Sequence, residues 1–177
     1  MMNIRFRSKL AEALEESREI VRYYRTGPLG DVAAANGKIV EEAMRKMIGE
    51  MVGLPVTTSG LVDLGVSKWH VGFQVKTFRT KADRIIFARS NKIGKAARIA
   101  DIRTRIVSSL DKTDTEHLVL MDYDMFSSNV NLYHLASVID GEVVTYGSFL
   151  SDATTSVSQT DTHFRICKKG LVSLGQA

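Results

Sequence analysis

Four polar side chains follow a pattern that can bind a metal ion and cleave a phosphate ester. Asp63 stands near the end of one predicted strand, and Gln74 and Lys76 stand near the end of the next. Glu41 lies on a predicted helix that precedes both strands. Phosphodiester hydrolysis needs a hard divalent cation, held by oxygen ligands, that lowers the pKa of an attacking water. These residue types supply such ligands together with an ammonium group.

Each of these residues has a distinct role in that chemistry. Asp63 is the expected main ligand, and Gln74 and Val75 offer a side-chain and a backbone carbonyl oxygen. Glu41 completes the set of ligands, directly or through a metal-bound water. Because side chains alternate across a strand, Lys76 shares a face with Gln74. There its ammonium can orient or deprotonate the water, or stabilise developing negative charge.

Hydrophobic periodicity predicts the elements that position these residues. Apolar residues recur at helical spacing from about Ser8 to Arg25, and again from Ala33 or Gly37 to Met51. Apolar runs bounded by turn residues then predict strands, interrupted by one amphipathic helix. The predicted strands are residues 61–64, 69–78, 84–89, 117–125 and 131–136. The helix, marked by Ile99, Ile102, Ile106 and Leu110, follows the third strand. A hairpin around Asp140 and Gly141 follows the fifth, and a last strand is predicted at 162–167.

The order of these elements predicts the fold class. Two helices, three strands, a helix and two strands form an α/β or α+β sandwich, in which helices flank a central mixed sheet. A length of 177 residues is near the commonest size of one domain. We therefore expect a single domain over residues 1–177. Its N-terminal helix covers about 8–25, its core about 37–136 and its C-terminal extension about 137–177.

A strongly basic segment follows the second predicted strand. Between Arg79 and Arg105 there are nine basic and two acidic residues, a local charge of +7 in a chain whose net charge is +4. A segment this basic favours a polyanionic partner such as double-stranded DNA. A solvated helix face explains the same charge. The candidate phosphate contacts are Arg79, Lys81, Arg84, Arg89, Lys92, Lys95 and Arg98.

Composition excludes several other classes of protein. The longest apolar runs are far shorter than the roughly 20 residues that cross a bilayer. The N-terminal residues lack the apolar stretch and cleavage site of a secretory signal. A single cysteine, Cys167, cannot form an internal disulfide, and with four scattered histidines it gives no zinc-binding spacing. We therefore expect a cytoplasmic protein with no membrane partner.

Three short stretches resemble the PD-(D/E)xK nuclease superfamily, which includes type II restriction endonucleases and archaeal-type Holliday junction resolvases. They are Gly37 to Glu41 (GKIVE), Ser59 to Asp63 (SGLVD) and Phe73 to Thr77 (FQVKT), within a similar region of about Gly37 to Ala136. The resemblance implies an αβββαβ core. It also implies that the aspartate and the second motif position bind Mg²⁺, and that the lysine assists the water.

Two positions depart from the motif of that superfamily. Val62 precedes the aspartate where the family has proline, and Gln74 stands where the family usually has an acidic residue. Losing that formal charge weakens metal binding, although glutamine variants of the motif resemble an accepted subset among restriction enzymes. The spacing from Gly37 selects Glu41 over its neighbour Glu42 by resemblance only.

These observations together lead to one hypothesis and its rivals. We expect a Mg²⁺-dependent DNA endonuclease of restriction type, acting as a homodimer because a double-strand break needs two centres. A junction-resolving or repair nuclease of the same fold is the nearest rival. The other rivals are a non-catalytic DNA-binding module and a protein whose basic segment contacts an acidic partner. Gln74 is the residue that leaves the first of these possible, because the family usually has an acidic residue there.

Ordinary structural explanations exist for each residue taken singly. Gln74 and Lys76 suit a solvent-facing edge strand, Asp63 suits a turn before Gly65, and Glu41 suits the first turns of a helix. Two further groups compete for a functional role. Asp122 and Asp124 share a strand face and can chelate a metal in a different fold, and His70 shares the face of Gln74 and can touch a phosphate.

Overall fold

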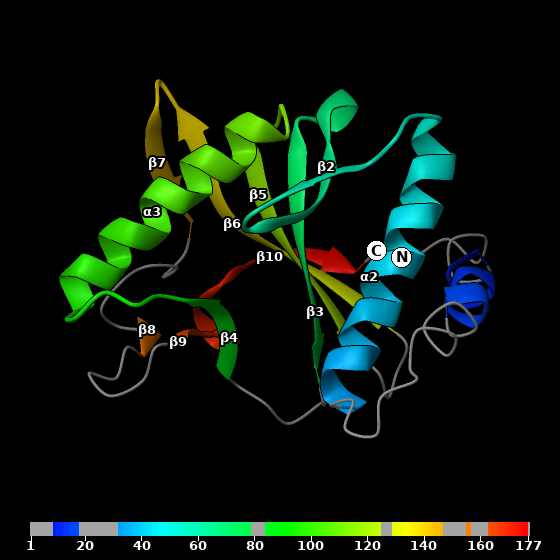
Figure 1. The fold of residues 1–177 in the computed structure, drawn as a ribbon, viewed down its shortest axis with the longest axis horizontal. Coiled ribbons are helices and arrows are strands. Elements are labelled where there is room, and N and C mark those ends of the chain that lie inside the picture. The colour runs from blue at the N-terminus through cyan, green and yellow to red at the C-terminus, as the bar shows by residue number, and fades with distance from the viewer. Residues whose placement is uncertain are drawn as a thin grey trace.

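Two long helices cover opposite faces of a mixed sheet (Figure 1). The computed structural model describes residues 9–17, 32–78, 84–124, 129–146, 155–156 and 163–176. Residues 9–17 are helical, α2 spans Val32–Val52 and α3 spans Lys95–Lys112. This arrangement confirms the predicted α+β class. The remainder of the predicted first helix lies outside the described residues.

The larger sheet has the order β1-β2-β3-β5-β6-β10, and β7 also pairs with β6. Strands β3 and β5 run parallel and the other pairs are antiparallel, so the sheet is mixed as expected. Helix α3 makes the crossover between the two parallel strands. The strands are β1 (Thr57–Ser59), β2 (Val62–Val66), β3 (Val71–Phe78), β5 (His117–Asp124), β6 (Asn129–Ile139), β7 (Glu142–Thr145) and β10 (Val172–Gln176).

The predicted strand at residues 84–89 exists but belongs to a second sheet. This strand, β4 (Arg84–Arg89), pairs with β9 (His163–Cys167), which in turn pairs with β8 (Thr155–Ser156). The third strand of the antiparallel meander beside β2 and β3 is instead β1, which is not among the predicted strands. Apolar alternation identifies a strand but not its partner, which here comes from far along the chain.

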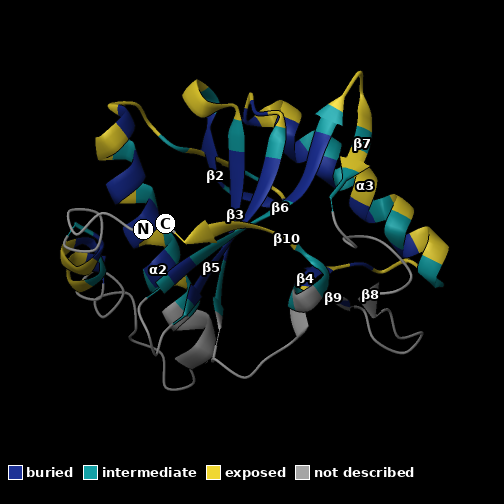
Figure 2. Ribbon diagram, turned by 180° about the vertical axis from the view of Figure 1, so that it is seen from behind, coloured by how far each residue is buried: buried dark blue, intermediate teal, exposed yellow. Residues whose placement is uncertain are grey.

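Both faces of the larger sheet are buried, each in a separate hydrophobic core. Leu118 and Leu120 pack on the α3 side with Ile106. Val119 and Met121 alternate with them and pack on the α2 side. Figure 2 shows the resulting contrast between buried central strands and the exposed edge strand β10. A polar side chain in the middle of β3 or β5 is therefore held away from water.

The ends of several elements agree with their sequence signals. Gly53 follows α2 with φ of 70°, a left-handed cap that glycine adopts without strain. Asp140 and Gly141, with φ of 52° and 79°, form the predicted hairpin between β6 and β7. The start of the second strand differs, because a 3₁₀ helix (Ser67–Trp69) delays β3 to Val71.

None of the helices in the described residues is long and apolar enough to span a bilayer.

Gly65 allows α3 to approach β2 closely, and its replacement tests this packing. A methyl group there would lie 2.6 Å from Thr113 Cβ and 2.7 Å from Thr57 Oγ1. We expect Gly65→Ala to lower the free energy of unfolding by about 1–3 kcal/mol, as overpacked sites do. Urea denaturation measures the change. Gly49→Ala is the control, because its methyl group meets nothing closer than 3.6 Å and favours the helix. Equal losses in both variants would contradict the close approach.

Candidate active site

Asp63 lies at the point where β2 separates from β3. The paired register of the two strands runs from Val66 with Val71 to Leu64 with Phe73, so Asp63 is the residue just outside it. Its Oδ2 accepts a hydrogen bond of 2.8 Å from the backbone N–H of Val75. The N–H and C=O of a strand residue point to the same side. The Val75 carbonyl therefore lies on the edge of β3 that faces the Asp63 carboxylate.

Burial shifts the pKa values of Asp63 and Lys76 in opposite directions. The pKa of Asp63 is raised, mainly by burial, although the Val75 N–H and the ammonium of Lys76 oppose the shift. The pKa of Lys76 is lowered, again mainly by burial, although the carboxylates of Asp63 and Glu41 oppose it. The carboxylate is thus poorly solvated and attracts a cation, while the amine loses its proton more readily than in water.

Gln74 presents a carbonyl oxygen for which the described residues supply no hydrogen-bond donor. The residue is 4% exposed, and its Nε2 donates a hydrogen bond of 3.3 Å to the backbone carbonyl of Phe87. Its Oε1 is buried and has no hydrogen-bond partner. A carbonyl oxygen accepts only from a donor, so the amide is oriented with Nε2 rather than Oε1 towards Phe87. An unpaired buried acceptor costs about 1–3 kcal/mol, so this oxygen favours a bound cation or water.

Glu41 faces the same site from α2. It contributes to the electrostatic environment of both Asp63 and Lys76, and its side chain is 17% exposed. Both of its oxygens are engaged, by Lys38 Nζ at 2.9 and 3.0 Å and by Arg45 Nη2 at 3.1 Å. Glu41 therefore suits contact with a metal-bound water better than direct ligation. The neighbouring Glu42 is more exposed and pairs with Arg45 Nε.

The oxygen atoms that Asp63, Gln74 and Val75 offer on β2 and β3 are of the kind that suits a hard divalent cation such as Mg²⁺. A carboxylate from Asp63, the unpartnered Gln74 Oε1 and the Val75 carbonyl are all oxygen donors, the type that Mg²⁺ binds while it keeps several waters. No group of three or more histidine, cysteine, aspartate or glutamate residues suitable for a metal occurs in the described part of the chain. The candidate site contains only two carboxylates, so the amide and backbone oxygens must supply the rest.

The basic segment between Arg79 and Arg105 is less accessible to a phosphate than the sequence suggests. Arg98, predicted to contact a phosphate, is only 3% exposed, and its Nε donates to the Lys92 carbonyl at 2.8 Å. That prediction is wrong, because Arg98 lies on the inner side of α3. Arg89 and Lys92 are exposed and Lys95 is partly buried. Arg79 and Lys81 lie outside the described residues, and only the backbone of Arg84 is described.

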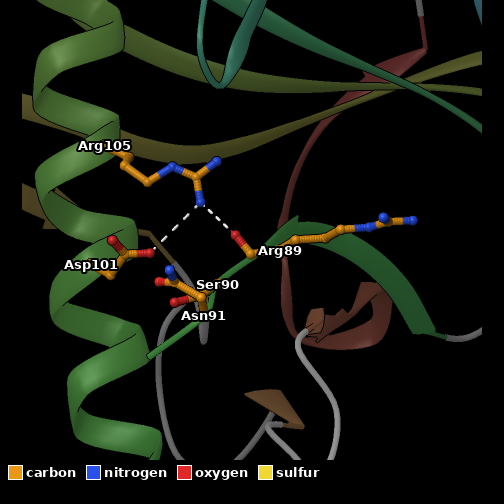
Figure 3. A pocket seen from close by; sticks show the side chains of 5 residues that line it. All are labelled: Arg89, Ser90, Asn91, Asp101 and Arg105. Carbon is orange, nitrogen blue, oxygen red and sulfur yellow. Dashed lines mark hydrogen bonds and ion pairs between the residues drawn. The ribbon is translucent and has the colours of Figure 1, made fainter. Parts of the chain in front are cut away.

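A hollow of about 380 Å³ lies between the end of β4 and α3 (Figure 3). Arg89, Ser90, Asn91, Asp101 and Arg105 line it. Arg105 Nη1 donates to the Arg89 carbonyl at 2.6 Å and lies 3.7 Å from Asp101 Oδ2, whereas the Arg89 side chain extends away from both. The hollow includes none of the predicted catalytic residues, and the protein itself partly neutralises its charge.

Asp122 and His70, the competing candidates for a functional role, each lie beside a residue of opposite type in another part of the fold. Asp122 is 1% exposed, and its Oδ2 lies 3.0 Å from Lys168 Nζ. Asp122 is thus ion-paired rather than joined with Asp124 as a chelating pair. His70 is exposed at the start of β3, at the opposite end from Lys76, with Nδ1 3.8 Å from Glu116. Sequence reasoning missed Lys168, for which the only signal is that a buried aspartate needs a cationic partner.

Comparison with protein-family models, with curated proteins and with solved structures gives no match. The assignment of this site therefore depends on its own residues.

Removing the charge of Asp63 should stabilise the protein near neutral pH. A raised folded-state pKa means that the protonated carboxyl is the form that folding favours, and that this contribution is lost as the pH rises through the folded pKa. Asp63→Asn keeps an acceptor for the Val75 N–H without the charge, and Glu41 still faces Lys76. We expect its free energy of unfolding to exceed that of the wild type at pH 7, with the difference shrinking towards the ordinary pKa of 3.8.

Urea denaturation across this pH range measures the effect. The control is Asp114→Asn, an exposed turn position with φ of 53°, which asparagine also tolerates. A destabilised Asp63→Asn at pH 7, or an equal gain in the control, would show that burial does not dominate the state of Asp63.

Proposed function

We propose that this protein is a Mg²⁺-dependent DNA endonuclease whose active site contains Asp63, Gln74, Lys76 and Glu41. The observation that carries this proposal is the presence of three unusual groups on the neighbouring strands β2 and β3. They are a desolvated carboxylate, a desolvated amine and a buried carbonyl oxygen without a hydrogen-bond partner. Residues held in such states cost stability, and they cluster at functional sites.

The chemistry follows from what each group does. Asp63 Oδ, Gln74 Oε1 and the Val75 carbonyl are the candidate ligands, and Glu41 orients water outside them. Bound Mg²⁺ supplies a lowered pKa for the attacking water and a positive charge opposite the phosphate. Lys76 contributes Nζ, whose lowered pKa suits it to orient that water and to exchange a proton with it. The buried faces of the sheet keep this exchange away from bulk solvent.

The topology of the sheet supports a nuclease of the PD-(D/E)xK type. The order α2, β1, β2, β3, α3 and β5, with β5 parallel to β3, is the αβββαβ order that the resemblance implies. Strand β4 is an addition between β3 and α3. On this basis we infer a restriction-type endonuclease that acts on double-stranded DNA. Its exposed Arg89 and Lys92 contact phosphates, and it works as a homodimer that cuts both strands.

Lys76→Ala should remove cleavage and leave DNA binding intact. General acid–base groups contribute about 10²–10⁴-fold to rate, so we expect a loss of this size. Purified wild type and variant are incubated with mixed-sequence plasmid and phage DNA, with Mg²⁺ or with EDTA. Discrete fragments that require both Mg²⁺ and Lys76 are the expected result.

Lys68→Ala is the matched control, since Lys68 is an exposed lysine just before β3, at the end opposite Lys76. Cleavage by Lys76→Ala at the wild-type rate would discard the assignment. Cleavage of branched but not linear duplexes would favour the junction-resolving alternative. Intact DNA with both substrates would overturn the nuclease and leave a DNA-binding module.

A further inference from the structure

A second lysine lies one strand away from Lys76, in the segment that follows the predicted core. Lys168 begins a 3₁₀ helix (Lys168–Gly170) after β9, and its Nζ lies 3.0 Å from Oδ2 of Asp122 on β5. The parallel register of β3 and β5 pairs Asp122 with Lys76. Neighbouring strands are about 4.8 Å apart. The residue that holds Lys168 is therefore the direct strand neighbour of the candidate catalytic lysine.

Asp122 and Lys76 also share a face of the sheet. Leu118 and Leu120 pack on the α3 side, and Asp122 continues their alternation. Lys76 continues that of Gln74, which reaches the Phe87 carbonyl on this side. Tyr133, paired with Leu120, packs there too, and its pKa is raised by burial and by the charge of Asp122. A polar strip thus runs across β3, β5 and β6.

The ion pair within this strip is asymmetric in its exposure. Asp122 is 1% exposed, and its Oδ1 has no hydrogen-bond partner among the described residues, whereas the Lys168 side chain is 21% exposed. Enclosing a carboxylate this deeply gains little net stability even when it is paired. The pair does fix a partly accessible ammonium at one position on the face that carries Lys76. A fixed ammonium of this kind suits the recognition of a phosphate as a point charge.

We propose that Lys168 binds a DNA backbone phosphate beside the one at Lys76, and that Asp122 is the positioning residue that holds Lys168 in place. This inference rests on the proposed nuclease function and adds a phosphate contact to the same site. The partner is the phosphodiester backbone, so the contact adds affinity without reading sequence. A pair that merely ties the C-terminal segment to the sheet would make no such contribution.

The salt dependence of DNA binding measures the number of phosphates that the protein neutralises. Each contact contributes about 0.9 to the slope of log K against log salt concentration. Binding of a fluorescently labelled duplex of mixed sequence is followed in EDTA, which prevents cleavage. We expect Lys168→Met to lower the magnitude of the slope by about 0.9. Lys168→Arg, which keeps the charge, should retain the wild-type slope, and the control Lys68→Met should leave it unchanged.

Removing one member of a buried ion pair can itself unfold the protein, so a second variant is needed. Asp122→Asn combined with Lys168→Met leaves no uncompensated charge, and its thermal unfolding reports whether it is folded. This double variant should still show the reduced slope. A folded double variant with the wild-type slope would overturn the inference and leave the pair a structural link. If the wild type binds and cleaves DNA, and this double variant binds it with the same salt dependence, only the role of Lys168 is refuted. If the wild type neither binds nor cleaves DNA, the proposed function is refuted as well.

Discussion

Two opposite charges, those of Asp63 and Lys76, are partly buried where β2 separates from β3. The larger sheet is packed on both faces, so Asp63 and Lys76 have little access to water at this point. The Val75 N–H holds the carboxylate in the gap that the strand pairing leaves open. Dehydration makes both ionised forms unfavourable. The same dehydration strengthens the attraction of Asp63 for a cation and eases proton loss from Lys76. The two groups therefore lower the stability of the fold while they become better suited to metal binding and proton transfer.

The α3 side of the sheet is completed by residues from the middle and from the C-terminal part of the sequence. Phe164 on β9 is fully buried beside Phe87 on β4, in the same core as Leu120. The pairing of β4 with β9 brings the C-terminal segment over this face, where Lys168 meets Asp122. Residues after 136 therefore contribute to the hydrophobic core and to the polar strip beside Lys76. The predicted C-terminal extension, about 137–177, therefore packs in part against the predicted core and is not separate from it.

Local patterns in the sequence predicted most of what surrounds the candidate site. Alternation along β3 separated Gln74 and Lys76 from Phe73 and Val75, and the two groups do occupy opposite faces. The parts that could not be predicted depend on distant partners. Nothing near residues 84–89 indicates β9, and nothing near Asp122 indicates a lysine 46 residues later. The error at Arg98 has a similar origin, because charge alone does not reveal that a guanidinium caps a carbonyl inside the fold.

If Asp63 belongs to a metal centre, Mg²⁺ stabilises the folded protein through its carboxylate. A ligand that binds only the folded state raises its stability by mass action, about 2.7 kcal/mol at a concentration one hundred times Kd. Thermal unfolding of wild type and Asp63→Asn is followed over a Mg²⁺ titration, with Asp114→Asn as the control, and needs no knowledge of the DNA substrate. We predict a Tm that rises with Mg²⁺ in wild type and control and stays constant in Asp63→Asn. A wild-type Tm that is indifferent to Mg²⁺, or an equal rise in all three proteins, would contradict a metal centre at Asp63.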